Sequence, residues 1–374
     1  AEIAAAIEAA PPADEIPMND DLVEAVDPRE EYVAEAVTLA SGDEAARADL
    51  RIVLTAMHGV GAAMTARVLA EAGFAKVSLV AAQADPDPDF PTVPFPNPEE
   101  AGALDMAIEQ ARAEDADLII AVDPDADRCA LAVPDPHAEA EWTPLSGDQI
   151  GCLLGEFLAS RGLRGSLANS IVSSRLLARI ARSHGLEHHT TLTGFKWIAR
   201  APQLAVGYEE AIGFCPNPSA ARDKDGIASS VVAASLFAAL KTEGRTAWDE
   251  LDRLAHAHGL HVTGPLTFRV EEIAQIATGM ARLRAQPPSE LAGSPVVEVS
   301  DLAEGYQGLP PTDGILVLTE AGDRVIARPS GTEPKLKCYL EVILPAPEGE
   351  TVPWEAARER LELIKREFGQ IIGL

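Results

Sequence analysis

The sequence predicts two consecutive α/β units with mixed, mostly parallel sheets, followed by a smaller α+β unit with an antiparallel sheet. Three observations lead to this fold class. Short apolar runs alternate with helical patterns through residues 28–259, which is typical of βαβ units. A polar stretch with Pro134, Pro136 and Pro144 interrupts the alternation. After Val262 the strand-like segments have few helices between them, which favours an antiparallel sheet.

The first unit opens with a helical pattern at 28–40. The remaining expected elements are strands at 50–56, 76–81, 118–122 and 129–133, and helices at 62–72 and 101–113. The helix at 62–72 precedes Gly73, and glycine commonly ends helices because it accepts left-handed backbone angles. Residues 85–98 contain six prolines, so this segment is expected to be a loop.

The other two units are predicted by the same patterns. In the second, we expect helices at 148–161, 176–184, 227–241 and 246–258, and strands at 166–172, 187–191 and 204–208. The helix at 227–241 is rich in alanine, so it is expected to pack closely. In the third, we expect strands at 266–270, 315–319, 324–328 and 337–343, and helices at 271–285 and 354–368.

Composition limits the class of protein. The 374 residues include 47% hydrophobic and 24% charged residues, as in ordinary globular proteins. A net charge of −29 argues against nucleic acid or an anionic membrane as a partner, and makes any basic cluster a candidate anion site. Four widely spaced cysteines are expected to be free thiols in a reducing, cytoplasmic setting. We expect a monomer or a homodimer.

The segment from Asp117 to Val133 carries the most informative pattern. The apolar run Leu118–Val122 ends in Asp123, Asp125 and Asp127. Three carboxylates this close repel one another unless a cation lies between them, and oxygen ligands of this kind suit Mg²⁺. An EF-hand loop is disfavoured, because Arg128 and Pro134 occupy the positions of its glycine and bidentate glutamate.

A second segment, Arg324–Lys337, contains four basic residues in an acidic chain. Arg328 can grip a phosphate bidentately. The hydroxyls of Ser330 and Thr332 and the flexible turn at Gly331 can add donors toward the same anion, and Lys335 follows. This segment therefore predicts a phosphate site.

Three further segments carry weaker signals. Glu209 and Glu210 follow a strand and suit hydrogen bonding to sugar hydroxyls, although, taken alone, the segment is better explained as a solvated loop. Carboxylates flank Lys224, which raises a lysine's pKa and suits a charged proton donor or a phosphate partner. Thr193 and Gly194 lie in a strand-to-helix turn that can offer N–H donors.

Together these segments resemble the α-D-phosphohexomutase family, the phosphoglucomutases and phosphomannomutases. Four motifs occur in the family's order: residues 123–128 resemble its metal loop, 191–196 its third-domain turn, 209–213 its sugar-binding loop and 328–335 its phosphate-binding loop. The likeness covers essentially the whole chain. Residues 207–214 with 223–226 are most similar to the phosphoglucomutase 2 and phosphopentomutase branch.

The resemblance implies a phosphosugar mutase that interconverts a sugar 1-phosphate with a 6-phosphate or 5-phosphate through a sugar bisphosphate intermediate. It implies Mg²⁺ as cofactor and a phosphorylated sugar as substrate. The implied metal ligands are Asp123, Asp125 and Asp127, and the implied catalytic residues are Arg128 and Lys224. The implied substrate-binding residues are Thr193, Gly194, Glu209, Glu210, Arg328, Ser330, Gly331, Thr332 and Lys335.

It also implies an organisation into family domains. Residues 1–27 are expected to be an N-terminal helix tail and linker. A metal-binding domain follows at 28–135, a sugar-binding domain at 136–259 and a phosphate-binding domain at 260–374.

Two departures from the family pattern bear on function. Ala211 stands where many members have a serine, which leaves hexose specificity open between glucose, mannose and pentose phosphates. The phosphoserine loop Thr-Ala-Ser-His-Asn-Pro does not occur in the sequence. We therefore expect the chain to lack the family's first domain and to be inactive alone.

Two other functions stay open on the residues. One is a non-catalytic module that binds sugar phosphates. The other, less favoured, is a haloacid dehalogenase-like phosphatase that uses Asp123 as nucleophile.

Overall fold

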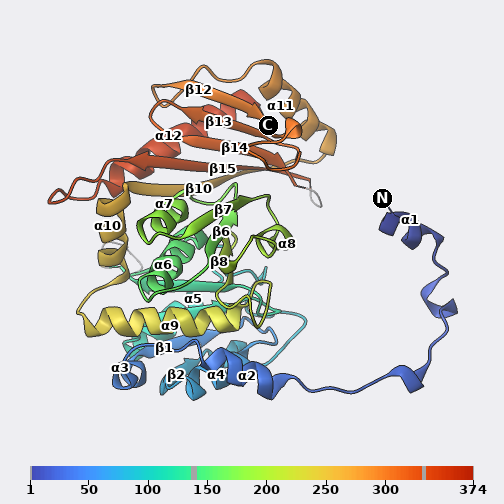
Figure 1. Ribbon diagram of the computed structural model, residues 1–374, viewed down its shortest axis with the longest axis vertical. Coiled ribbons are helices and arrows are strands. Elements are labelled where there is room, and N and C mark those ends of the chain that lie inside the picture. Colours follow the sequence, from blue (N-terminus) through green and yellow to red (C-terminus); the bar gives the residue numbers. More distant parts are fainter. Residues whose placement is uncertain (1, 136–140, 331–333, 374) are drawn as a thin grey trace.

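The computed structural model describes residues 2–135, 141–330 and 334–373. Its elements form three layers along the long axis, each built around one sheet (Figure 1). The predicted fold class is confirmed: two α/β units with mixed sheets precede an antiparallel sheet covered by helices.

The first sheet is built from the first unit, in the order β2-β1-β3-β4-β5. Its parallel part joins β1 to β2 and β3, and β4 and β5 extend it in antiparallel pairings. The strands are β1 (Arg51–Thr55), β2 (Lys76–Leu79), β3 (Leu118–Val122), β4 (Cys129–Pro134) and β5 (Trp142–Pro144). The helices are α2 (Arg29–Val37), α3 (Glu44–Asp49), α4 (Ala62–Glu71) and α5 (Asp105–Glu114). Helix α4 ends at Glu71, one residue before the predicted end, and Gly73 follows its C-cap Ala72 with a φ of +92°.

The second sheet has the order β7-β6-β8-β9, with β6 parallel to both neighbours and β9 antiparallel to β8. Its strands are β6 (Ser166–Ser170), β7 (Glu187–Thr191), β8 (Leu204–Glu209) and β9 (Gly213–Cys215). The helices of this part of the chain are α6 (Gly147–Ala159), α7 (Leu176–Ser183), α8 (Phe195–Ile198), α9 (Gly226–Thr242) and α10 (Ala247–His258).

Helix α9 joins the first two layers. It follows the second sheet in sequence but packs against α2, α3, α4, β3 and β4 of the first unit, and lies between the two layers (Figure 1). Its alanines and serines are buried almost all round, so the neighbouring backbones approach closely. As a result, one continuous apolar core extends from Val33 to Leu254.

The third sheet is antiparallel throughout, in the order β10-β15-β14-β13-β12-β11. Its strands are β10 (Leu260–Arg269), β11 (Glu290–Leu291), β12 (Ser294–Asp301), β13 (Ile315–Thr319), β14 (Arg324–Pro329) and β15 (Lys335–Leu344). The helices α11 (Ile273–Ala285) and α12 (Trp354–Ile372) cover one face over a separate core. Ile326 on the other face packs against Ile171 and Val172 of the second unit.

The N-terminal residues extend away from the layers (Figure 1). Helix α1 (Glu2–Ala9) and the short 3₁₀ turns at Ala13–Glu15 and Asp20–Leu22 bury no side chain. No helix among the described residues is long and apolar enough to cross a membrane.

Candidate active site

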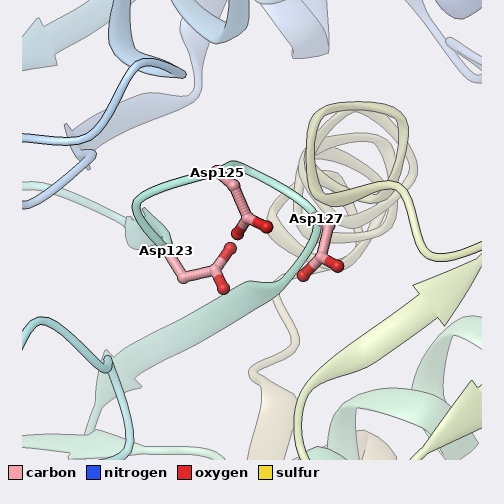
Figure 2. A group of neighbouring side chains, drawn as sticks. All are labelled: Asp123, Asp125 and Asp127. Carbon is pink, nitrogen blue, oxygen red and sulfur yellow. The ribbon is translucent and has the colours of Figure 1, made fainter. Parts of the chain in front are cut away.

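The three aspartates lie in the turn between the antiparallel strands β3 and β4. Ala126 takes a left-handed φ of +60°, and its N–H donates to the Asp123 carbonyl at 2.9 Å, which reverses the chain in five residues. Figure 2 shows the carboxylates of Asp123, Asp125 and Asp127 gathered around the turn. One oxygen from each lies within 4.8 Å of the others. The spacing read from the sequence therefore does bring the three groups together.

Cationic groups accompany the three carboxylates. Asp123 is almost fully buried, and it accepts hydrogen bonds from the backbone N–H of Arg128 at 2.9 Å and from its Nε at 2.6 Å. Burial raises the pKa of Asp123, against the opposing effect of Arg128. Lys224 Nζ lies 2.7 Å from Asp127 Oδ2. Both predicted catalytic residues thus contact the aspartate cluster.

Glycines allow two neighbouring segments to hold this turn. A Cβ on Gly59, in the loop after β1, would lie 2.4 Å from Pro124 Cα. A Cβ on Gly226, the first residue of α9, would lie 2.3 Å from the Arg128 carbonyl oxygen. The N–H of Gly226 instead donates to the Ala126 carbonyl at 3.1 Å. Backbone segments of both α/β units therefore pack directly against the turn.

Glu209 and Glu210 lie at the tight connection between β8 and β9. Glu210 Oε2 accepts hydrogen bonds from Ser170 Oγ at 3.0 Å and Ser173 Oγ at 2.9 Å. Burial, reinforced by the Glu210 charge, raises the pKa of Glu209 to about 7. A Cβ on Gly213 would lie 2.4 Å from Lys224 Cδ and 3.1 Å from Glu209 Oε1, so glycine leaves room for both side chains.

The turn before α8 contributes Thr193 and Gly194. Gly194 has a φ of +101° and precedes the first helical residue, Phe195. Lys224 Nζ lies 5.8 Å from the centre of the Phe195 ring, within the range of a cation–π contact. This turn therefore precedes a residue that lies beside Lys224, the lysine that pairs with Asp127.

The described residues of the predicted phosphate segment lie in β14, in the first residues of β15 and at Ser330 and Pro334 next to these strands. Ser330 N–H donates to the Lys335 carbonyl at 2.8 Å. Burial raises the pKa of Tyr339, and the nearby Arg328 guanidinium opposes that rise. The antiparallel register sets Arg328 opposite Lys337. The predicted contacts at Gly331 and Thr332 lie outside the described residues.

A cavity of about 680 Å³ opens where the three units meet. Of the predicted site residues described, Glu210 and Lys335 line it. The other lining residues are not predicted from the sequence, and they include Arg269, Lys337 and Tyr339. Arg269 lies opposite Lys335 on β10, a pairing that only strand register reveals. The excess of basic residues at 324–337 was the available signal for Lys337.

Comparison with known proteins assigns the family. The domain descriptions of phosphoglucomutase/phosphomannomutase match in order: alpha/beta/alpha domain II at residues 30–136, alpha/beta/alpha domain III at 146–257 and the C-terminal domain at 266–357. The chain belongs to the phosphoglucomutase/phosphomannomutase family, the α-D-phosphohexomutases.

Individual relatives agree with this assignment. The chain is 43% identical over 326 residues to a protein named "Probable phosphomannomutase" of Haemophilus influenzae, covering 87% of this chain and 64% of the relative. It is 34% identical to a phosphoglucomutase of Staphylococcus aureus, covering 80% of this chain and 58% of the relative. The chain therefore spans about six tenths of the length of these relatives.

The fold is also similar to solved structures. A phosphoglucomutase/phosphomannomutase family protein from Burkholderia thailandensis superposes with a TM-score of 0.67 at 19% identity. The superposition covers 94% of this chain and 66% of that protein. At this identity the likeness concerns the fold.

Proposed function

We propose that the chain supplies the metal-, sugar- and phosphate-binding parts of a Mg²⁺-dependent phosphohexomutase, which moves a phosphoryl group between positions of one sugar through a bisphosphate. The observation that carries the proposal is the cluster at Asp123, Asp125 and Asp127, with Arg128 and Lys224 against it. An oxygen-only donor set of this size suits Mg²⁺. Bound there, Mg²⁺ would offset negative charge on the reacting phosphate.

The protein's own residues then have distinct tasks. Arg128 and Lys224 present positive charge beside the aspartates, where a transferred phosphate needs it. Asp127 raises the pKa of Lys224 although burial opposes it, so the ammonium holds a proton that it can give to a sugar oxygen. Glu209 and Glu210 accept hydrogen bonds from sugar hydroxyls. Arg328, Ser330 and Lys335 hold the phosphate that does not react.

The position of Asp123 disfavours the phosphatase alternative. As a nucleophile it would have to present an oxygen to substrate, but its side chain is 2% exposed and both oxygens accept hydrogen bonds from Arg128. A charged, hydrogen-bonded and buried carboxylate is better suited to holding a cation.

Metal binding tests the proposal. Calorimetry on the whole chain should detect Mg²⁺ binding, and Asp125→Asn should weaken it at least tenfold. Asp89→Asn, which removes an exposed carboxylate from the same unit, is the matched control and should leave it unchanged. Equal affinities in the two variants would refute the metal site.

Turnover provides the second test. The 374 residues contain no Thr-Ala-Ser-His-Asn-Pro loop, so we expect the chain alone to bind a sugar phosphate without converting it. The assay supplies glucose 1-phosphate, glucose 1,6-bisphosphate and Mg²⁺ and follows glucose 6-phosphate. Conversion above background would contradict the expectation, and release of inorganic phosphate would indicate a phosphatase.

A further inference from the structure

A buried carboxylate outside the proposed metal, sugar and phosphate sites joins the second and third units. Glu341 lies in β15, and none of its side chain is exposed. It accepts hydrogen bonds from Ser174 Oγ at 2.8 Å and from Arg175, through the backbone N–H at 2.8 Å and Nε at 2.6 Å. His261 Nδ1 lies 3.0 Å away, and Arg324 Nη2 lies at 3.2 Å. One carboxylate thus holds groups from three separate segments.

The side chains around the Glu341 carboxylate stabilise its negative charge. Burial alone would raise the pKa of Glu341, but Arg324, the hydrogen bond from His261 and Arg175 outweigh it and hold the pKa well below its usual range. Arg324 also donates to the carbonyls of Ile171 and Ser173. The loop at 171–175, which follows β6, is therefore fixed to the third sheet at both ends.

The same loop leads to the proposed sugar site. Ser173 Oγ donates to Glu210 Oε2 at 2.9 Å, one residue before the Ser174 that contacts Glu341. In the other direction along β15, Tyr339 shares a strand face with Glu341, since alternate residues point the same way. The charges of Glu210 and Arg328 both act on the pKa of Tyr339, and β14, which carries Arg324 and Arg328, pairs with β15. The contacts of Glu341 therefore fix the loop that holds Glu210 to the pair of strands that carries Arg328.

We propose that Glu341 is a positioning residue that holds the sugar-binding carboxylate Glu210 and the phosphate-binding Arg328 at the span of a single ligand. The inference rests on the proposed function. Two contacts to one molecule reinforce each other only when both groups are held at the distance that the molecule spans. Without the link through Glu341, Glu210 and Arg328 contact the ligand independently, and the additional affinity from binding it at both ends is lost.

Two probes separate positioning from general stabilisation. Inorganic phosphate needs only the phosphate segment, whereas glucose 1-phosphate must reach both sites. Titration should show that the wild-type chain binds glucose 1-phosphate more tightly than inorganic phosphate. Glu341→Gln should reduce that preference about tenfold, the size of one lost hydrogen bond to a charged group, with little change for inorganic phosphate. Ser174→Ala, which leaves the ion pairs intact, should reduce it by a smaller factor and guards against a misfolded first variant.

The matched control is Glu367→Gln. Glu367 in α12 accepts a hydrogen bond from the Ala292 N–H at 2.6 Å within the third unit, so its replacement removes a contact of that unit without altering the link to the loop at 171–175. The preference for glucose 1-phosphate should persist in this variant. If Glu341→Gln weakens the binding of both probes equally, or leaves the preference for glucose 1-phosphate unchanged, the inference fails while the proposed function stands. A wild-type chain with no preference would overturn the proposed function and the inference with it.

Discussion

Asp148 provides a sharp test of the energetics of the interior. It lies in the first turn of α6 and is nearly fully buried. Its Oδ1 accepts hydrogen bonds from Ser174 N–H at 2.6 Å and from the Tyr208 hydroxyl at 2.9 Å. Burial raises its pKa from the ordinary 3.8 to about 7, and the hydrogen bonds only partly oppose that rise. The folded state therefore prefers the protonated carboxyl.

The sign and size of the effect follow from linkage. Below pH 3.8 the carboxyl is protonated in both the folded and the unfolded state, so its titration does not change the free energy of unfolding. As pH rises from 3.8 to about 7, the unfolded state releases the proton first, so the free energy of unfolding falls. At 1.36 kcal/mol for each pH unit, the full effect is about 4 kcal/mol, reached above pH 7.

Asp148→Asn should abolish this pH dependence. The amide oxygen can still accept from Ser174 and Tyr208, and it carries no proton that titrates in this range. Urea denaturation of wild-type and variant at pH 4, 6 and 8 isolates the effect, because the other titrating groups largely cancel in the difference. The variant should gain stability relative to wild type by about 4 kcal/mol between pH 4 and pH 8. A flat difference would refute the reasoning.

Three other substitutions test particular contacts. Arg328→Ala should weaken binding of glucose 1-phosphate by about 2 kcal/mol in calorimetry, as for loss of a charged hydrogen-bond donor; unchanged affinity would refute the phosphate assignment. Gly213→Ala should also weaken this binding, because the new Cβ displaces Lys224 or Glu209, and an unaltered dissociation constant would contradict the packing described. Gly369→Ala lies within α12, where a Cβ meets nothing closer than 3.8 Å, so thermal unfolding should show a gain of about 0.5–1 kcal/mol; a loss would show that the site is tighter than described.

The sequence predicted the parts of the site that depend on local order. The strands at 118–122 and 315–319 occur as expected, because each is a compact apolar run with clear breaks. The Asp123–Asp127 turn was predictable for a similar reason. Carboxylates at alternate positions after a buried strand are brought together by one reversal of the chain. The carboxylates beside Lys224 in the sequence predicted that it pairs with an acidic group. In the structure its Nζ lies 4.0 Å from the neighbouring Asp223 but only 2.7 Å from Asp127, which is distant in sequence.

Features that depend on distant contacts were not predictable in this way. The strand β12 at Ser294–Asp301 was missed, since three of its eight residues are exposed and only one is fully buried, so the apolar signal is short. Arg269 reaches the cavity through its register with Lys335, which no local pattern specifies. The place of Glu341 is equally hidden, because its partners come from positions up to 167 residues away.

The position of α9 has a consequence for how the protein is synthesised. Strands β3 and β4 emerge from the ribosome about a hundred residues before α9, the helix that packs on them. Until Thr242 has been added, part of the first sheet's apolar surface has no cover. The first unit therefore completes its folding only after most of the second has been translated. A nascent chain that pauses between 135 and 226 exposes an apolar sheet surface, which favours aggregation.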